Sequence, residues 1–259
     1  PATIPATPTT YYKFSNSLVN SGATSTDYAQ LAYAPSQTSD LFGNANGAYL
    51  LNGSSQYITS TSTYAVTGSY SIGLAFKTTT TSGGLLAGIG DAISGLSTSF
   101  DKQLYMNNAG KIVFSHKNSG GTAQNVISPK SYNDGNWHYV VATWSTSGMK
   151  LYMDGNTTTV ANNAINTDTD LTGYLRVGYD NITSAPTSNY FGGKLDEVYF
   201  FNGTEITSAN VNTYFKPLIN SYDLPICPGS TLNLTTYSGG TWAWSGPNSF
   251  SSTSQTPTA

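Results

Sequence analysis

The stretch Trp137-His-Tyr-Val-Val-Ala-Thr-Trp144 decides the fold class of this chain. It is a run of aromatic and β-branched residues, which fit the pleated surface of a β-sheet, and it has the length of an ordinary strand. Asn133-Asp-Gly135 comes shortly before it and supplies residues that tolerate the positive φ of hairpin turns. The stretch therefore predicts a β-strand that follows a hairpin turn.

Similar runs recur along the chain between clusters of Gly, Asn, Asp and Ser, which is the pattern of antiparallel strands. The clearest runs cover residues 69–77, 111–115, 150–153, 175–178 and 194–201. Residues 108–110 and 154–156 have the composition of two further hairpin turns. We therefore predict an all-β protein that folds as an antiparallel β-sandwich.

A single short helix is predicted where this alternation stops. Val211, Tyr214 and Phe215 fall at positions i, i+3 and i+4 of one helix face. Thr207 or Ser208 precedes them as an N-cap, and a proline that follows ends the helix. The helix is expected to close the domain.

The chain divides into three predicted parts. Residues 1–10 are rich in Pro and Thr and predict an extended linker that arrives from a preceding module. Residues 11–219 hold the main strand pattern and the helix. Strand periodicity restarts after a cluster of turn formers near residue 220, so residues 220–259 predict a linker and an incomplete second β-module.

Composition excludes several classes of partner. Only 9% of residues are charged, against roughly 25% in an average soluble domain, and the net charge is -3. The lysines and the single Arg176 form no run of the kind that phosphate or anionic lipid requires, which argues against nucleic acid and membrane-surface binding. No apolar stretch approaches the roughly 20 residues that span a bilayer. The only cysteine, Cys227, excludes a disulfide within this chain and a Cys-based metal cluster.

The order of several sequence strings resembles the laminin-G-like jelly rolls of the concanavalin A-like superfamily over about residues 11–216. The matching strings are Tyr11-Tyr-Lys-Phe14, Gly47-Ala-Tyr-Leu-Leu-Asn-Gly53, Ser71-Ile-Gly-Leu-Ala-Phe-Lys77, Gly135-Asn-Trp-His-Tyr-Val-Val-Ala-Thr143, Leu151-Tyr-Met-Asp-Gly155 and Phe191-Gly-Gly-Lys-Leu-Asp-Glu-Val-Tyr199. The resemblance implies a lectin-like jelly-roll β-sandwich.

The end of the chain resembles the first strands of the Ig-like or PKD-like repeats of large Bacteroidota adhesins. The strings that carry this likeness are Cys227-Pro-Gly-Ser-Thr-Leu-Asn-Leu and Trp244-Ser-Gly-Pro-Asn-Ser-Phe250. The resemblance implies an incomplete repeat, whose Cys227 would pair with a cysteine beyond this chain.

The sequence offers little support for catalysis. A glycoside hydrolase needs two carboxyl groups that flank the scissile bond, whereas Asp196 and Glu197 are adjacent and are expected to point to opposite faces of a strand. His138 is predicted to be a packed strand residue and His116 a surface residue at a strand end. We therefore predict that the chain is not an enzyme.

The resemblance implies one metal site. It places Asp196 on a late strand beside the opening loop, where many laminin-G-like domains hold Ca²⁺, and it makes Asn16 and Asn20 the candidate companions. Calcium prefers six to eight oxygen ligands from carboxylates, carbonyls and amides. Ca²⁺ is the one cofactor that the sequence predicts.

A carbohydrate site is predicted on rim loops, where an aromatic ring can stack on a sugar and polar side chains can bind its hydroxyl groups. The preferred residues are Tyr179, Asp180, Asn181, Asn189 and Tyr190. A second loop with the same chemistry covers residues 101–108 around one tyrosine.

Three functions remain open on the sequence. The first is a non-catalytic adhesin module that binds a glycan or surface glycoprotein, the second is a structural spacer in a long surface filament, and the third is a glycoside hydrolase. The resemblance also implies an extracellular place on a bacterial cell surface, export by the type IX route, and secretion or outer-membrane anchoring proteins as further partners.

Overall fold

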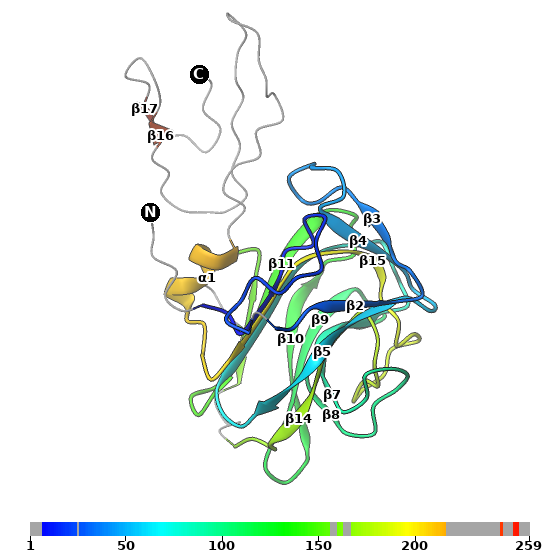
Figure 1. Cartoon of the computed structure of the whole chain (residues 1–259). Helices are drawn as coiled ribbons and strands as arrows, with labels where there is room; N and C mark the ends of the chain where they lie inside the picture. Colours follow the sequence, from blue (N-terminus) through cyan, green and yellow to red (C-terminus); the bar gives the residue numbers. More distant parts are fainter. Residues whose placement is uncertain are drawn as a thin grey trace, which may run out of the picture.

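The computed structural model describes residues 7–24, 26–155, 160–162, 167–215, 244–245 and 251–253. Two antiparallel sheets pack face to face as a jelly-roll β-sandwich (Figure 1), which confirms the predicted fold class. The front sheet has the strand order β13-β12-β11-β6-β15-β4-β3, and β1 also pairs with β15. The back sheet has the order β10-β9-β8-β7-β14-β5-β2.

The strands and the helix have the following bounds. The front sheet consists of β1 (Thr10–Tyr12), β3 (Ser36–Thr38), β4 (Ala48–Asn52), β6 (Tyr70–Lys77), β11 (Trp137–Ser145), β12 (Gly148–Met153), β13 (Val160–Asn162) and β15 (Gly192–Asn202). The back sheet consists of β2 (Ala29–Ala32), β5 (Tyr57–Val66), β7 (Gly84–Gly90), β8 (Phe100–Met106), β9 (Lys111–Lys117), β10 (Ala123–Ser131) and β14 (Leu171–Val177). The helix α1 covers Ser208–Phe215, and two short strands, β16 (Trp244–Ser245) and β17 (Ser251–Ser252), pair with each other.

Alternation along the strands builds the core between the two sheets. In β6, Ile72, Leu74 and Phe76 are fully buried in this core, and Leu74 lies opposite the buried Val140 of β11. Because each buried aliphatic or aromatic side chain contributes about 1.5 to 3 kcal/mol, such rows dominate the stability of a chain with few charges. Trp144 belongs to the same core, as its place in an apolar run predicts.

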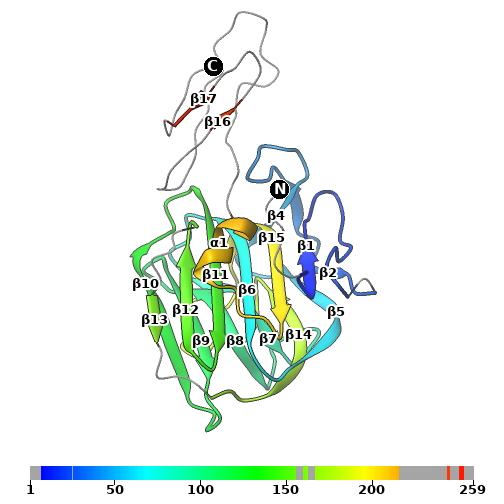
Figure 2. The same cartoon turned by 90° about the vertical axis from the view of Figure 1, so that its left-hand side faces the viewer.

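The outer face of the front sheet carries a second apolar cluster, which α1 covers. Ile206 and Val211 pack there with Tyr139 and Phe201. Figure 2 shows α1 lying across this sheet. The side chain of Thr207 is hydrogen-bonded to that of Asn210 (2.7 Å), and its carbonyl accepts the amide hydrogen of Val211 (3.0 Å), so the predicted helix and its N-cap are confirmed.

The three predicted turns have different outcomes. Residues 108–110 join the paired strands β8 and β9, as predicted. The turn at residues 133–135 is not a hairpin, because it carries the chain from β10 in the back sheet to β11 in the front sheet. The prediction of a hairpin there is wrong: turn residues permit a reversal but do not decide which strand the chain pairs with next. Asn156, the last residue of the third predicted turn, lies outside the described residues.

Most of the predicted second module lies outside the described residues, and so does Cys227. The predicted linker at residues 1–10 is described only from residue 7 onward. Within the described part of the chain, no helix is long and apolar enough to cross a membrane.

Candidate functional site

Arg176 is a buried cation on the outer face of the back sheet. It lies in β14 between Leu175 and Val177, whose side chains face the core, so its own side chain points to the opposite face. Its guanidinium is 0% exposed and donates hydrogen bonds to the carbonyls of Ala92 (2.5 Å) and Gly95 (2.7 Å). Arg176 therefore fixes the loop between β7 and β8 against the sheet.

Three tyrosine rings continue from this guanidinium as a series. The guanidinium carbon lies 4.8 Å from the ring centroid of Tyr57, which lies 5.3 Å from that of Tyr179. The rings of Tyr179 and Tyr190 are stacked, with centroids 3.7 Å apart and an interplanar angle of 4°. Tyr57 and Tyr179 are buried, whereas Tyr190, at the end of the series, is partly exposed. We call these three residues the aromatic rim.

The loop between β7 and β8 adds exposed apolar side chains beside the rim. Ile93 is 39% exposed and Leu96 is 47% exposed, although Ile and Leu are among the residues most often buried. The amide of Gly95 points toward the hydroxyl oxygen of Tyr57 at 3.4 Å, so the loop tip lies next to the rim. The loop is thus held in place while its apolar side chains face solvent.

Asp180 supports this arrangement from inside. Its carboxylate accepts hydrogen bonds from the amide (2.7 Å) and the hydroxyl (2.7 Å) of Ser97 and from the amide of Asn181 (2.8 Å). It is 1% exposed, and one carboxylate oxygen lies 3.7 Å from Nε of Arg176. Asp180 therefore holds the loop and is not open to a ligand.

The remaining predicted ligand residues are placed on two sides of the rim. The side-chain amide of Asn181 donates to the carbonyl of Ser97 (2.7 Å), so this side chain also serves the loop. Asn189 is partly exposed beside Tyr190, and its carbonyl accepts the amide hydrogen of Leu85 (3.1 Å). The structure therefore brings all five predicted residues to one region, with Asn189 and Tyr190 toward solvent and Asp180 turned inward.

Sequence reasoning missed the residues that support the rim and overrated the second loop. Most of that predicted loop is the strand β8 (Phe100–Met106), in which Tyr105 is 2% exposed and packs against Leu85 and Ile182, so it offers no ring to a ligand. Neither Arg176 nor Tyr57 was predicted to belong to a site. The available signal was the lone arginine of the chain, which lies inside an apolar strand where an unpaired charge would be unfavourable.

Asp196 and Glu197 lie on the outer face of the front sheet, at an irregularity in β15. Asp196 is opposite Ala75, which belongs to the apolar cluster of that face. Glu197 has a positive φ of 51°, and its carboxylate accepts hydrogen bonds from the hydroxyls of Tyr11 and Tyr199, which share this face. The expectation that the two carboxylates point to opposite faces is therefore wrong, because the bulge breaks the strand alternation.

Burial disfavours the charged form of both carboxyl groups. Burial, the Glu197 carboxylate and the nearby Asp40 raise the pKa of Asp196 to about 8. Burial also raises the pKa of Glu197, although its two tyrosine partners act in the opposite direction. Asp196 is 1% exposed, so it holds a proton at neutral pH unless a cation binds next to it.

The predicted calcium ligands fit this place only in part. Asp196 and Glu197 offer carboxylate oxygens in one region. Asn20 does not, because its side-chain oxygen accepts the amide hydrogens of Tyr11 and Gly22 (both 2.8 Å) and its nitrogen donates to the carbonyl of Thr24 (2.8 Å). Asn16 is exposed, and its side-chain oxygen accepts a hydrogen bond from Gln37 (3.4 Å). Calcium binding at Asp196 therefore stays a prediction.

His138 occupies a structural position, as its strand sequence predicts. It is 9% exposed, and its ring nitrogens lie 3.0 Å from Asp154 and 2.9 Å from Asp134. Burial lowers the pKa of His138, but the hydrogen bonds to Asp154 and Asp134 outweigh burial and raise it overall. The imidazole thus ties two turns together at one end of the front sheet.

The comparisons with known proteins agree with this architecture. The family model Laminin_G_3, described as the concanavalin A-like lectin/glucanases superfamily, matches residues 52–212. The chain belongs to this family. A search of the curated proteins finds no match.

Similar solved structures include binding domains of botulinum neurotoxins. The binding domain of serotype D/C VPI 5993 has a TM-score of 0.58 at 13% identity, over 80% of this chain and 51% of that chain. A botulinum neurotoxin type C structure, whose description names an interaction with two ganglioside molecules, has a TM-score of 0.58 at 12% identity, over 80% of this chain and 50% of that chain. This chain spans about half the length of these proteins, and the likeness shows the fold alone.

Proposed function

We propose that this domain is a non-catalytic carbohydrate-binding module of a cell-surface adhesin, and that the aromatic rim is its ligand site. The observation that carries the proposal is the stack of Tyr190 on Tyr179, with Tyr190 partly exposed and the stack backed by Tyr57. An aromatic plane of this kind binds the apolar C–H face of a sugar ring, and polar neighbours bind its hydroxyl groups. Asn189 is such a neighbour.

Preorganisation supports the same function. Arg176 and Asp180 fix the loop between β7 and β8 through buried hydrogen bonds, so little conformational freedom is lost when a ligand binds. Neutral, hydroxyl-bearing ligands suit this surface because its charged groups are already paired inside the protein. Exposed Ile93 and Leu96 would contact an apolar part of the same ligand or of the protein that carries it.

The arrangement of carboxylates supports a module without catalytic activity. Glycoside hydrolysis needs one carboxyl group as acid and a second as base or nucleophile, both in reach of the scissile bond. Asp180 is buried under the rim, and Asp91 accepts the amide hydrogens of Thr98 (2.8 Å) and Ser99 (2.9 Å). Glu205, in the connection between β15 and α1, is paired with Lys150. Asp196 and Glu197 do share one face, but Asp196 is 1% exposed and the Glu197 carboxylate accepts hydrogen bonds from the hydroxyls of Tyr11 and Tyr199. Among the described residues, these carboxyl groups therefore form no pair of exposed groups that could act as acid and base.

The adhesin context extends the proposal beyond the domain. We place the module on a bacterial cell surface, with a glycan or glycoprotein as partner, because the fold is that of lectin-like binding domains and the sequence carries few charges. Fold alone does not decide function, so the ligand site has to be tested directly.

A glycan array probed with the full chain tests the proposal. The array is run once with millimolar Ca²⁺ and once with EDTA, and a Tyr190→Ala variant serves as the matched probe. Binding of wild type to a related set of glycans, with loss of signal for the variant, is the expected result. Equal binding by both proteins would move the site away from the rim, and silence of both would favour the spacer function.

A further inference from the structure

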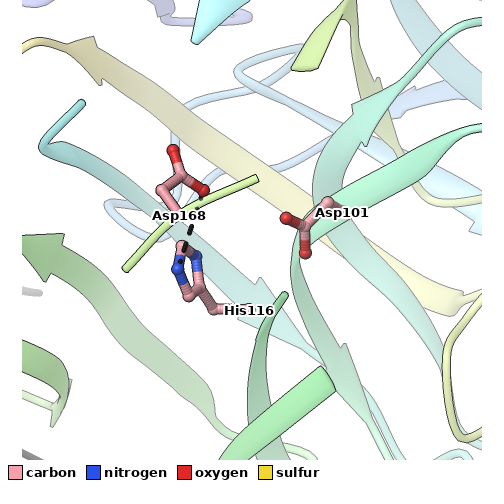
Figure 3. A group of neighbouring side chains, drawn as sticks. All are labelled: Asp101, His116 and Asp168. Atoms are coloured by element: carbon pink, nitrogen blue, oxygen red, sulfur yellow. Dashed lines mark ion pairs between the residues drawn. The ribbon is translucent and has the colours of Figure 1, made fainter. Parts of the chain in front are cut away.

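A second group of polar side chains lies between the two sheets, away from the aromatic rim. Lys102 comes from β8, His116 from β9, and Asp168 from the segment that leads into β14. Figure 3 shows Asp168 and His116 side by side, with Asp101 nearby. The side chains of Lys102 and His116 are 0% exposed, that of Asp101 is 3% exposed, and that of Asp168 is 8% exposed. The prediction that His116 is a surface residue is wrong. His116 lies two residues after Phe114 in β9, so both side chains point into the core.

The amine of Lys102 is held between two carboxylates. Its Nζ lies 2.8 Å from Oδ1 of Asp168 and 3.4 Å from Oδ2 of Asp101, and it donates to the carbonyl of Thr169 (2.9 Å). Neighbouring residues of a regular strand point to opposite faces, but Lys102 has a positive φ of 55°. This unusual backbone conformation lets the side chains of adjacent residues meet, and such conformations gather at functional sites.

Aromatic rings line the core side of this group. Burial lowers the pKa of His116 to about 4, so its ring is neutral at pH 7. That ring stacks on Trp144 with centroids 4.6 Å apart, and one of its nitrogens lies 2.9 Å from the hydroxyl of Tyr70. The ammonium thus faces two carboxyl groups in a buried setting, where the charged form of a carboxyl group is disfavoured.

The pKa shifts of the two carboxyl groups suit the condensation of an amine with a carboxylic acid. Burial raises the pKa of Asp168 to about 6, against the opposing effect of Lys102, and burial also raises the pKa of Asp101. When one of the two carboxyl groups is protonated, the cluster consists of an ammonium, one carboxylate and one carboxylic acid. These are the starting forms for condensation of an amine with an acid.

We propose that Lys102 and Asp168 form an intramolecular amide bond, with Asp101 as the group that transfers the proton. Asp101 takes a proton from the ammonium, which frees the electron pair of Nζ. That pair attacks Cγ of the protonated Asp168 carboxyl, so a C–N bond forms and the C–OH bond breaks. The hydroxyl leaves with one of the two remaining amine protons as a single water molecule, and Asp101 retains the proton it took.

The geometry favours the loss of one particular oxygen. Oδ2 of Asp168 is buried and has no hydrogen-bond partner among the described residues, so its departure breaks no hydrogen bond and removes an unfavourable buried polar atom. Oδ1 becomes the amide oxygen. A metal ion is the other candidate occupant, since ligand atoms of Asp101, His116 and Asp168 lie within 4.8 Å of one another. The Lys102 ammonium, however, already contacts both carboxylates at that place.

Mass spectrometry of the purified full chain tests the bond. The denatured wild-type protein should have a mass lower than that of its sequence by one water molecule. Because the Asp-Gly pairs at residues 134–135 and 154–155 can also lose water by cyclisation, a tryptic map must locate the loss. The expected product joins residues 78–111, uncleaved after Lys102, to residues 151–176. A wild-type protein with the full sequence mass and a free Lys102 peptide would overturn the proposal.

Two further comparisons separate the bond from mere proximity. Lys150 and Glu205 also form an ion pair, but their side chains are 25% and 20% exposed, so this pair should show no cross-link in the same digest. An Asp101→Asn variant keeps shape and removes the proton acceptor, so it should retain the full sequence mass while it melts cooperatively. A cross-link formed to the same extent in Asp101→Asn would overturn the role of Asp101.

Discussion

Arg176 and Lys102 are both fully buried cations of the back sheet, yet they face different partners. Arg176 points to the outer face and donates to backbone carbonyls of the loop between β7 and β8. Lys102 points to the core and contacts two carboxylates. A guanidinium stays protonated in proteins and matches several acceptors at once, whereas an amine can release its proton and act as a nucleophile. The comparison teaches that burial of a cation positions a binding loop in one place and prepares a covalent bond in the other.

Replacement of Lys102 should produce the largest effect on stability. An amide between Lys102 and Asp168 closes a loop with a sequence separation of 66 residues, and a cross-link over such a loop stabilises by about 4 kcal/mol in the chain-entropy treatment. Lys102→Arg keeps the charge but cannot form the amide. Urea unfolding should therefore show a free energy of unfolding about 4 kcal/mol lower for this variant. An unchanged unfolding midpoint would mean that Lys102, like Arg176, forms no covalent bond.

Replacement of Arg176 comes next. Arg176→Ala leaves the Asp180 carboxylate buried without its cation and two carbonyls without their donor, which should destabilise the fold by about 3 kcal/mol. The same variant should lose glycan binding, because the loop beside the rim is released. Arg176→Lys is the matched control: it keeps the charge, lacks the planar fork, and should recover stability only in part. Full recovery by lysine would show that charge alone holds the loop.

Asp196 offers the contrasting case of a buried acid without a cation. Its pKa is about 8 in the folded state, well above the ordinary value of 3.8. The folded state therefore binds this proton more tightly than the unfolded state, and the resulting stabilisation is fully present below about pH 4. That stabilisation is lost as pH rises toward 8, and a shift of several units corresponds to about 2 kcal/mol or more at pH 9. Asp196→Asn should therefore melt above wild type at pH 9 and near it at pH 4. Added Ca²⁺ should raise the melting temperature of wild type at pH 9 if calcium binds there, and leave the variant unchanged.

The sequence predicted the helix and strands such as β6, β11 and β15, because alternation and turn residues are local signals. It did not predict β7 or β10, and residues 101–106, which were expected in a loop, lie in β8. The sequence did not show which side chains near the aromatic rim face solvent. Asp180 and Asn181 have the composition of ligand residues, but both are hydrogen-bonded to Ser97, which lies more than eighty residues away along the chain. The pair of Lys102 and Asp168 was not predicted for the same reason, because its two residues are far apart in the sequence. Strand alternation failed at Glu197, where a positive φ turns the side chain to the face that it was expected to avoid.

Tyr190 should give the smallest effect on stability and the clearest effect on binding. Its ring is partly exposed, and truncation removes one stacked contact with Tyr179, so Tyr190→Ala should melt close to wild type. Stacking of an aromatic ring on a ligand is worth roughly 1.5 kcal/mol, which corresponds to about tenfold in affinity.

The most direct measurement is a calorimetric titration of the best glycan from the array into wild type, Tyr190→Phe and Tyr190→Ala. If the rim is the ligand site, the phenylalanine variant keeps the stacked ring and binds within about threefold of wild type, while the alanine variant binds at least about tenfold more weakly at the same melting temperature. Equal affinity of the alanine variant and wild type would contradict the assignment of carbohydrate binding to the aromatic rim.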